Sequence, residues 1–145
     1  MPLARAYFDS SVVVKRYLHE PGSQPARDVM RRNLFVSSAI APLETLSAVS
    51  RRFKAGELGA KILDAIVSKL ELDRLHWELV PVGNAVLERA EEIVRTGNVR
   101  ALDAIHIACA LSFNEGSRDR ILFFSADEKQ LDAAASFGLR VQRIG

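Results

Sequence analysis

Four carboxylates in this 145-residue sequence stand where the elements of a parallel α/β fold would bring them together. They are Asp9, Glu44, Asp103 and Asp127. Asp9 directly follows an apolar run that is typical of a strand, and Asp127 closely follows another such run. Glu44 and Asp103 each lie in the first turn of a predicted helix. Because ligands of parallel sheets bind outside the carboxyl ends of the strands, we expect these side chains to share one rim.

Carboxylates gathered at one rim would repel each other and raise their own pKa values. A divalent cation removes this repulsion, and Mg²⁺ or Mn²⁺ prefers oxygen ligands. Such an ion suits phosphoryl chemistry, because it neutralises phosphate oxygens and activates a bound water. No HxxxH or CxxC pattern offers a zinc site instead. Taken singly, each acid could equally be a helix cap or a partner of the helix dipole, although Asp103 has mostly apolar neighbours.

The elements that must position these acids alternate between short apolar runs and longer helical patterns. The expected strands are Ala4–Phe8, Leu34–Ser38, Trp77–Val82, Arg120–Ser125 and Arg140–Ile144. The expected helices are Val12–Glu20, Ser23–Asn33, Pro42–Ala55, Ala60–Leu75, Ala85–Arg95, Ala101–Phe113 and Glu128–Ser136. This alternation predicts an α/β domain with a mainly parallel sheet. No repeat or long linker divides it, so residues 1–145 are expected to form a single domain.

The composition is that of an ordinary globular protein, with 48% hydrophobic and 26% charged residues. Disorder and a coiled coil are therefore not expected for most of the chain. No apolar run approaches the roughly 18 residues that a membrane helix needs. The first residues contain no long apolar region, so we expect no signal peptide. The single Cys109 cannot form an internal disulfide, which favours a cytoplasmic protein.

Basic residues are concentrated in the first part of the chain. Residues 1–54 hold nine Lys or Arg against four Asp or Glu, whereas residues 55–145 hold eleven against fourteen. This asymmetry suits a polyanionic partner, although a solvated basic surface would give the same pattern. The candidates for phosphate contact lie close in sequence to the four acids, and they are Lys15, Arg51, Arg52 and Arg100.

Two further features have a structural interpretation beside a functional one. His106 lies one helical turn after Asp103, and we expect it to be a packed, hydrogen-bonded residue rather than a catalytic base. The apolar run Val12–Val14, with Tyr17 and Leu18, is expected to be core or, alternatively, a partner surface.

Four segments together resemble the PIN-domain family, and more narrowly the VapC-type toxins of bacterial and archaeal toxin–antitoxin pairs. These segments are YFDSS, PLETLSAV, VRALDAIHIACA and FFSADEKQL, in this order. The resemblance covers essentially the whole chain. It implies a single-domain three-layer α/β/α sandwich and a metal-dependent endoribonuclease that leaves 5′-phosphate and 3′-hydroxyl ends. It also implies an RNA substrate, a small antitoxin that blocks the cleft, and a homodimer.

The same resemblance assigns roles to individual residues. Asp9, Asp103 and Asp127 would hold Mg²⁺ or Mn²⁺, and Glu44 would complete the site directly or through water. The hydroxyls of Ser11 and Ser125 would orient carboxylates or water. One departure from the family pattern is Pro42, which fits a first helical turn but could shift the Glu44 carboxylate.

Two other functions are compatible with parts of the pattern. The first is a PIN-like module that binds RNA or a partner without cutting, which the four retained acids argue against. The second is a receiver-like or phosphatase-like domain in which Asp9 accepts a phosphoryl group. A phosphatase of that kind needs an acid two residues later, where this chain has Ser11, and the paired acids and late lysine of a receiver are absent.

Overall fold

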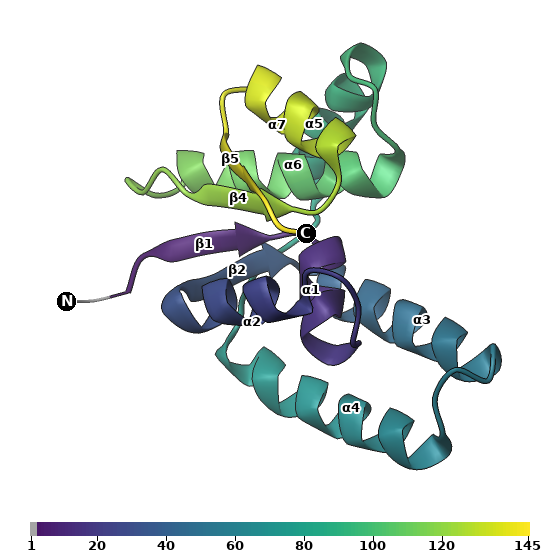
Figure 1. Cartoon of the computed structure of the whole chain (residues 1–145). Coiled ribbons are helices and arrows are strands. Elements are labelled where there is room, and N and C mark those ends of the chain that lie inside the picture. The colour runs from purple at the N-terminus through teal and green to yellow at the C-terminus, as the bar shows by residue number, and fades with distance from the viewer. Residues whose placement is uncertain (1–2) are drawn as a thin grey trace.

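A computed structural model describes residues 3–145 and contains, within them, one parallel sheet of five strands (Figure 1). The strands are β1 (Arg5–Phe8), β2 (Leu34–Ser38), β3 (Glu78–Val80), β4 (Leu122–Ser125) and β5 (Arg140–Arg143). Their order across the sheet is β3-β2-β1-β4-β5, and every neighbouring pair is parallel. The predicted α/β class with a mainly parallel sheet is confirmed.

Seven α-helices within residues 3–145 cover the two faces of this sheet (Figure 1). They are α1 (Ser10–Tyr17), α2 (Ser23–Arg32), α3 (Ala41–Lys54), α4 (Ala60–Asp73), α5 (Asn84–Thr96), α6 (Ala101–Glu115) and α7 (Glu128–Ser136). Helices α1 to α4 lie on one side of the sheet, and α5 to α7 lie on the other. This arrangement is the three-layer sandwich that the family resemblance implies. No helix within residues 3–145 is both long enough and apolar enough to cross a membrane.

Alternating side chains of the central strands supply both halves of the core. Tyr7 of β1 packs with α5, α6 and α7, whereas Ala6 and Phe8 pack with α1 to α4. The phenol ring of Tyr7 stacks on Phe123 with ring centroids 5.2 Å apart, and Phe8 stacks on Phe124 at 5.3 Å. Burial on both faces explains why these strands read as continuous apolar runs in the sequence.

Three predicted element boundaries differ from the structure for local chemical reasons. The first helix begins at Ser10 rather than Val12, because the extended Asp9 caps it and its Oδ1 accepts a hydrogen bond from the Val12 amide at 3.2 Å. The strand expected over Trp77–Val82 is only Glu78–Val80, since Pro81 cannot donate to a sheet ladder. The helix expected over Ala60–Leu75 ends at Asp73 and continues as a 3₁₀ turn, Arg74–His76.

The order of the strands creates a crevice between β1 and β4. From β1 the chain proceeds through α1 on one face, whereas from β4 it proceeds through α7 on the opposite face. The two connections therefore diverge at the carboxyl ends of neighbouring strands, which is where ligands bind in open parallel sheets. Asp9 directly follows β1, and Asp127 lies two residues after the end of β4.

Candidate active site

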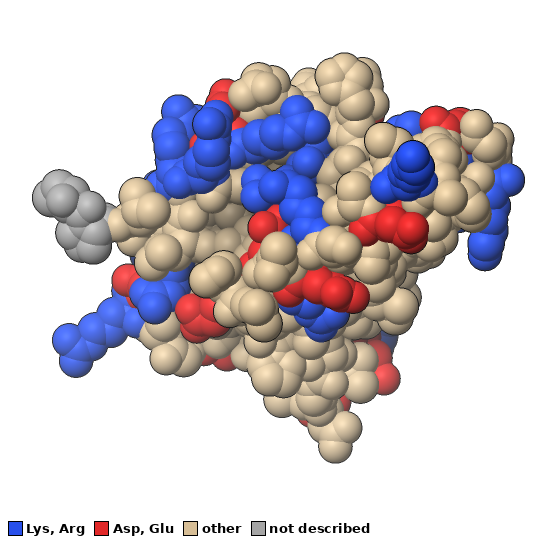
Figure 2. Space-filling view, turned by 90° about the horizontal axis from the view of Figure 1, so that it is seen from below, with Lys and Arg blue, Asp and Glu red and all other residues tan. Residues whose placement is uncertain are grey.

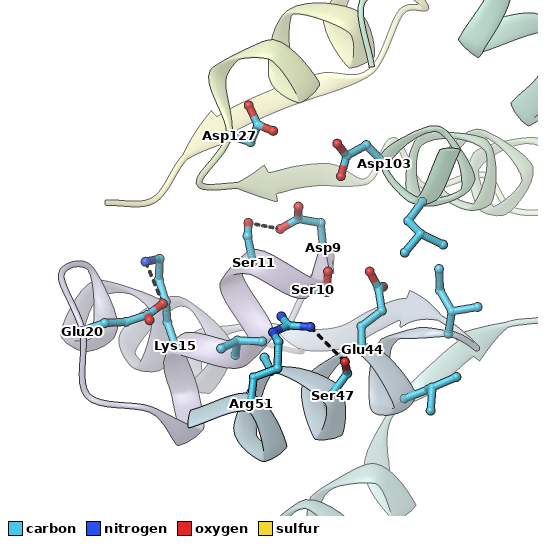
Figure 3. Close-up of a pocket in the computed structure, with 15 residues that line it drawn as sticks. Asp9, Ser10, Ser11, Lys15, Glu20, Glu44, Ser47, Arg51, Asp103 and Asp127 are labelled. Atoms are coloured by element: carbon cyan, nitrogen blue, oxygen red, sulfur yellow. Dashed lines mark hydrogen bonds and ion pairs between the residues drawn. The ribbon is translucent and has the colours of Figure 1, made fainter. Parts of the chain in front are cut away.

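A cavity of about 560 Å³ opens at the carboxyl edge of the sheet, next to this crevice (Figure 3). All four carboxylates predicted from the sequence line it, and they come from four different segments of the chain: Asp9, Glu44, Asp103 and Asp127. Figure 3 shows Asp9 between the layer of α1 and α3 below it and Asp103 and Asp127 above it. The fold therefore gathers the predicted acids around one space.

Asp9 is the most deeply buried of the four, with 2% of its surface exposed. Its Oδ1 accepts hydrogen bonds from the Ser11 hydroxyl at 2.6 Å and from the Val12 amide at 3.2 Å. Its Oδ2 lies 3.1 Å from the Ser125 hydroxyl. Burial raises the pKa of Asp9 to about 6, although the charge of His106 and these hydrogen bonds favour the ionised form.

The two predicted serines connect Asp9 to the loop after β4. The oxygen of Ser11 accepts a hydrogen bond from the Ala126 amide at 3.1 Å, and that of Ser125 accepts one from the Asp127 amide at 3.0 Å. The Ser125 hydroxyl also lies 2.7 Å from Gln130 Oε1, so its single proton serves either Gln130 or Asp9. Sequence reasoning missed Gln130, which lies in a polar stretch of α7 yet is fully buried.

Asp103 and Asp127 form the opposite wall of the cavity. Asp103 is half-buried in the first turn of α6, and its pKa is raised by burial and then by the nearby charge of Asp127. Asp127 is exposed and caps α7 by accepting a hydrogen bond from the Lys129 amide at 3.0 Å. The capping role considered from the sequence is therefore real for Asp127, and it coexists with its place on the cavity wall.

Glu44 is held by a buried histidine. It lies in the first turn of α3, where Pro42 also lies as expected. Its Oε1 is 2.7 Å from His106 Nε2, and His106 Nδ1 is 2.8 Å from the hydroxyl of Tyr7. His106 is packed and hydrogen-bonded, as the sequence indicated, but Tyr7 was not recognised as part of the site, because it reads as an ordinary strand residue.

The donor set suits a hard divalent cation, since it consists of carboxylate oxygens around a single cavity. Within residues 3–145, no lysine or arginine forms an ion pair with any of the four carboxylates. In the same part of the chain, no three metal-binding side chains are close enough together to surround one ion. The site is thus an open acidic cavity whose negative charge lacks a basic side chain to neutralise it.

The four predicted phosphate-binding residues separate into two groups. Arg51 lines the acidic cavity and makes only a weak local contact, to the Ser47 hydroxyl at 3.0 Å. Arg100 lines a second cavity of about 390 Å³, which shares Asp103 and Asp127 with the first.

The other two are engaged by neighbouring groups. Lys15 lines the acidic cavity but pairs with Glu20 at 3.1 Å and donates to the Pro21 carbonyl at 2.7 Å. Arg52 pairs with Glu20 at 3.1 Å and with Glu57 at 3.2 Å, and it does not line the acidic cavity. The structure thus leaves Arg51 and Arg100 better placed than Lys15 and Arg52 to meet a ligand at the acids.

The positive charge predicted for the first part of the chain also has a place in the fold. Residues 5–54 form β1, α1, α2, β2 and α3, which contribute most of the layer on one side of the sheet. Figure 2 looks at the molecule from this side and shows Lys and Arg gathered mainly along one edge, with acidic side chains beside them.

Comparisons with known proteins agree with this fold and site. Residues 6–136 match the PIN domain. Ribonuclease VapC46 of Mycobacterium tuberculosis (strain ATCC 25618 / H37Rv) is 31% identical over 141 residues, which are 96% of this chain and 97% of that protein.

Two solved structures have a similar fold at low sequence identity. VapBC2 from Rickettsia felis, bound to a DNA fragment from their promoter, superposes with a TM-score of 0.65 at 14% identity and covers 97% of this chain and 99% of its own. VapBC-1 from nontypeable Haemophilus influenzae gives a TM-score of 0.62 at 12% identity, with 95% and 96% covered. The family match over most of the chain and the identity to a curated relative establish that this chain belongs to the PIN-domain family.

Proposed function

We propose that this protein is an Mg²⁺- or Mn²⁺-dependent endoribonuclease and the toxin of a toxin–antitoxin pair. The observation that carries the proposal is the cavity lined by four carboxylates, none of them neutralised by a lysine or arginine within residues 3–145. The ribonuclease relative and the toxin–antitoxin complexes of similar fold support RNA as the substrate. One chain of residues 1–145 in a single domain supplies all four acids.

The roles of the side chains follow from their positions. Asp9, Asp103 and Asp127 would hold the ion, and Glu44 would complete the site directly or through water. When bound, the ion neutralises phosphate oxygens and activates water for attack on the phosphodiester. The hydroxyls of Ser11 and Ser125 hold the two oxygens of Asp9 in place from opposite sides of the crevice.

The substrate path follows from two adjoining cavities. They share Asp103 and Asp127, so an RNA strand that crosses the acids would pass from one cavity into the other. Arg51 stands at the first cavity, whereas Arg100 and Lys129 stand at the second. Cations on both sides of the acids would bind the phosphates that flank the bond to be cut.

The partner proposal rests on the rim of the acidic cavity. Leu43 and Leu102 line it and remain 70% and 50% exposed. An antitoxin segment with apolar side chains for these leucines and an arginine for the acids would block the cavity. We further propose a cytoplasmic homodimer, as the family resemblance implies.

Cleavage of a mixed cellular RNA pool by purified protein, free of any antitoxin, tests the function. We expect cleavage with Mg²⁺ or Mn²⁺ that stops in EDTA and in the Asp9→Asn variant. Asp132→Asn on the exposed face of α7 is the matched control and should cleave like the wild type. Cleavage that survives Asp9→Asn would indicate a contaminant. RNA binding without cleavage, equal in wild type and Asp9→Asn, would instead favour the non-catalytic binding module.

A further inference from the structure

Three elements that are distant in sequence meet in one buried hydrogen-bonded chain. The Tyr7 hydroxyl on β1 contacts His106 Nδ1 on α6 at 2.8 Å. The other ring nitrogen of this histidine, Nε2, contacts Glu44 Oε1 on α3 at 2.7 Å. Tyr7 is 0% and His106 1% exposed, whereas the Glu44 side chain is 19% exposed and lines the acidic cavity. Figure 3 shows the Glu44 carboxylate at this end of the chain, directed into the cavity.

The two contacts agree on the position of the protons. Burial raises the pKa of Tyr7 well above its ordinary value, so the phenol keeps its proton and can donate it to Nδ1. The proton of a neutral imidazole then resides on Nε2, where it points at a carboxylate oxygen. The opposite tautomer would direct the Nε2 lone pair at the Glu44 carboxylate, which is unfavourable at 2.7 Å.

The rings themselves are fixed by packing. Tyr7 stacks on Phe123 with centroids 5.2 Å apart and meets the His106 ring edge-to-face at 5.8 Å. A buried polar group that only filled space would cost desolvation free energy, which an apolar side chain of similar size avoids. The chain of polar groups leads from this apolar core to a single cavity-lining oxygen, which is the arrangement expected of a device that orients that oxygen.

We propose that Tyr7 and His106 are positioning residues, which hold the Glu44 carboxylate in the active site through one defined histidine tautomer. This inference rests on the proposed function for the meaning of the Glu44 position. The His106 contact engages Oε1 and leaves Oε2 available to the cavity. Tyr7 acts one step further away, because its hydroxyl selects the tautomer that donates to Glu44.

Nitrogen-resolved NMR of the metal-free protein tests the tautomer directly, without any activity measurement. We expect His106 of the wild type to carry its proton on Nε2, with Nδ1 unprotonated. In Tyr7→Phe, which keeps the ring but removes the hydroxyl, we expect a mixture of tautomers. Tyr17→Phe is the matched control, because its hydroxyl donates to Asp73 at 2.7 Å and Tyr17 does not line the acidic cavity. A wild-type proton on Nδ1, or an unchanged tautomer in Tyr7→Phe, would overturn the proposal.

Binding of Mn²⁺ by calorimetry and RNA cleavage supply the functional readouts. Loss of such an outer partner typically costs about 10–100-fold in metal affinity or activity, and we expect a loss of this size for His106→Leu. His106→Gln places an amide donor near the Nε2 position, so it should recover most of the loss. Equal defects in both variants would contradict positioning. If the wild type cleaves no RNA, the proposed function fails, while the tautomer and Mn²⁺ affinity still decide the roles of Tyr7 and His106.

Discussion

Asp9 meets two opposing requirements, since it is almost fully buried and yet must be ionised to bind a cation. Burial raises its pKa from 3.8 to about 6, so between these pH values the folded protein keeps a proton that the unfolded chain has lost. The free energy of unfolding of the metal-free protein therefore falls as pH rises through this window. At about 1.4 kcal/mol per pKa unit, the ionised Asp9 costs roughly 3 kcal/mol above pH 6.

The Asp9→Asn substitution should accordingly stabilise the protein while it abolishes activity. Asparagine carries no charge and remains a good helix cap for the Val12 amide. Urea unfolding in EDTA should show Asp9→Asn to be more stable than the wild type at pH 8 by up to about 3 kcal/mol, with little difference at pH 4. Asp132→Asn, at an exposed position, should change neither value. A difference that is the same at both pH values would show that burial of the charge is not its cause.

Arg51 and Arg52 offer a second contrast at the residue scale, because they are adjacent in α3 but differ in their contacts. Arg51→Gln should raise the KM for RNA severalfold and reduce the salt dependence of binding by about one unit of slope, since one phosphate contact is lost. Arg52→Gln removes the ion pairs with Glu20 and Glu57, so it should lower stability by about 1 kcal/mol or less and leave the KM unchanged. Fluorescence binding titrations at several salt concentrations measure both effects. Equal effects of the two variants on the KM would contradict this assignment.

The sequence predicts the acids of this site better than their partners. The acids stand directly after strands or in first helical turns, where a general rule for parallel sheets applies. The contact between Tyr7 and His106 joins residues 99 positions apart, and no local pattern indicates it. Gln130 is likewise buried by tertiary packing, although it lies among polar residues of α7. Neighbours such as Arg51 and Arg52 look alike until their ion pairs are known.

At the scale of elements, α6 is the helix on which core and site depend together. It presents Asp103 at the cavity wall, His106 inside the molecule and Cys109 in the core, at successive intervals of three residues. Cys109 is 0% exposed, and burial also raises the pKa of its thiol. Both properties disfavour the reactive thiolate in the folded state.

The Cys109 thiol should therefore report on the opening of α6. We expect a disulfide reagent such as dithionitrobenzoate to modify the native protein slowly, at a rate limited by opening of the structure. In urea the single cysteine should react at once, with one equivalent per chain. Rapid modification of the native protein would mean that α6 is not held in the core as described.

Elements were predictable where a local signal marks their ends, and less so where packing decides. Gly97 and Gly116 end helices close to where the sequence indicates. The strand order is different, because β1 pairs with β4 across more than one hundred residues. Only this pairing creates the crevice between two diverging connections, and the crevice is what brings Asp9 and Asp127 to one cavity.

At the scale of the whole molecule, the four acids link metal binding to stability. A ligand that binds only the folded state stabilises it by mass action, by about 2.7 kcal/mol at one hundred times its Kd. Mn²⁺ should therefore raise the unfolding temperature of the wild type at pH 8, and EDTA should reverse the rise. The increase should shrink at pH 5, because protons then compete for Asp9, whose pKa lies near 6 in the metal-free protein.

The Asp9→Asn variant separates this specific effect from general ion binding. It should begin from a higher unfolding temperature in EDTA at pH 8 and gain much less from Mn²⁺ than the wild type, whereas Asp132→Asn should gain as much. Calorimetric unfolding at matched protein and metal concentrations measures the gain. An equal gain in wild type and Asp9→Asn would place the bound ion outside the acidic cavity. The expected crossing, a variant more stable without metal and less stabilised with it, follows because the buried Asp9 charge destabilises the fold unless a cation neutralises it.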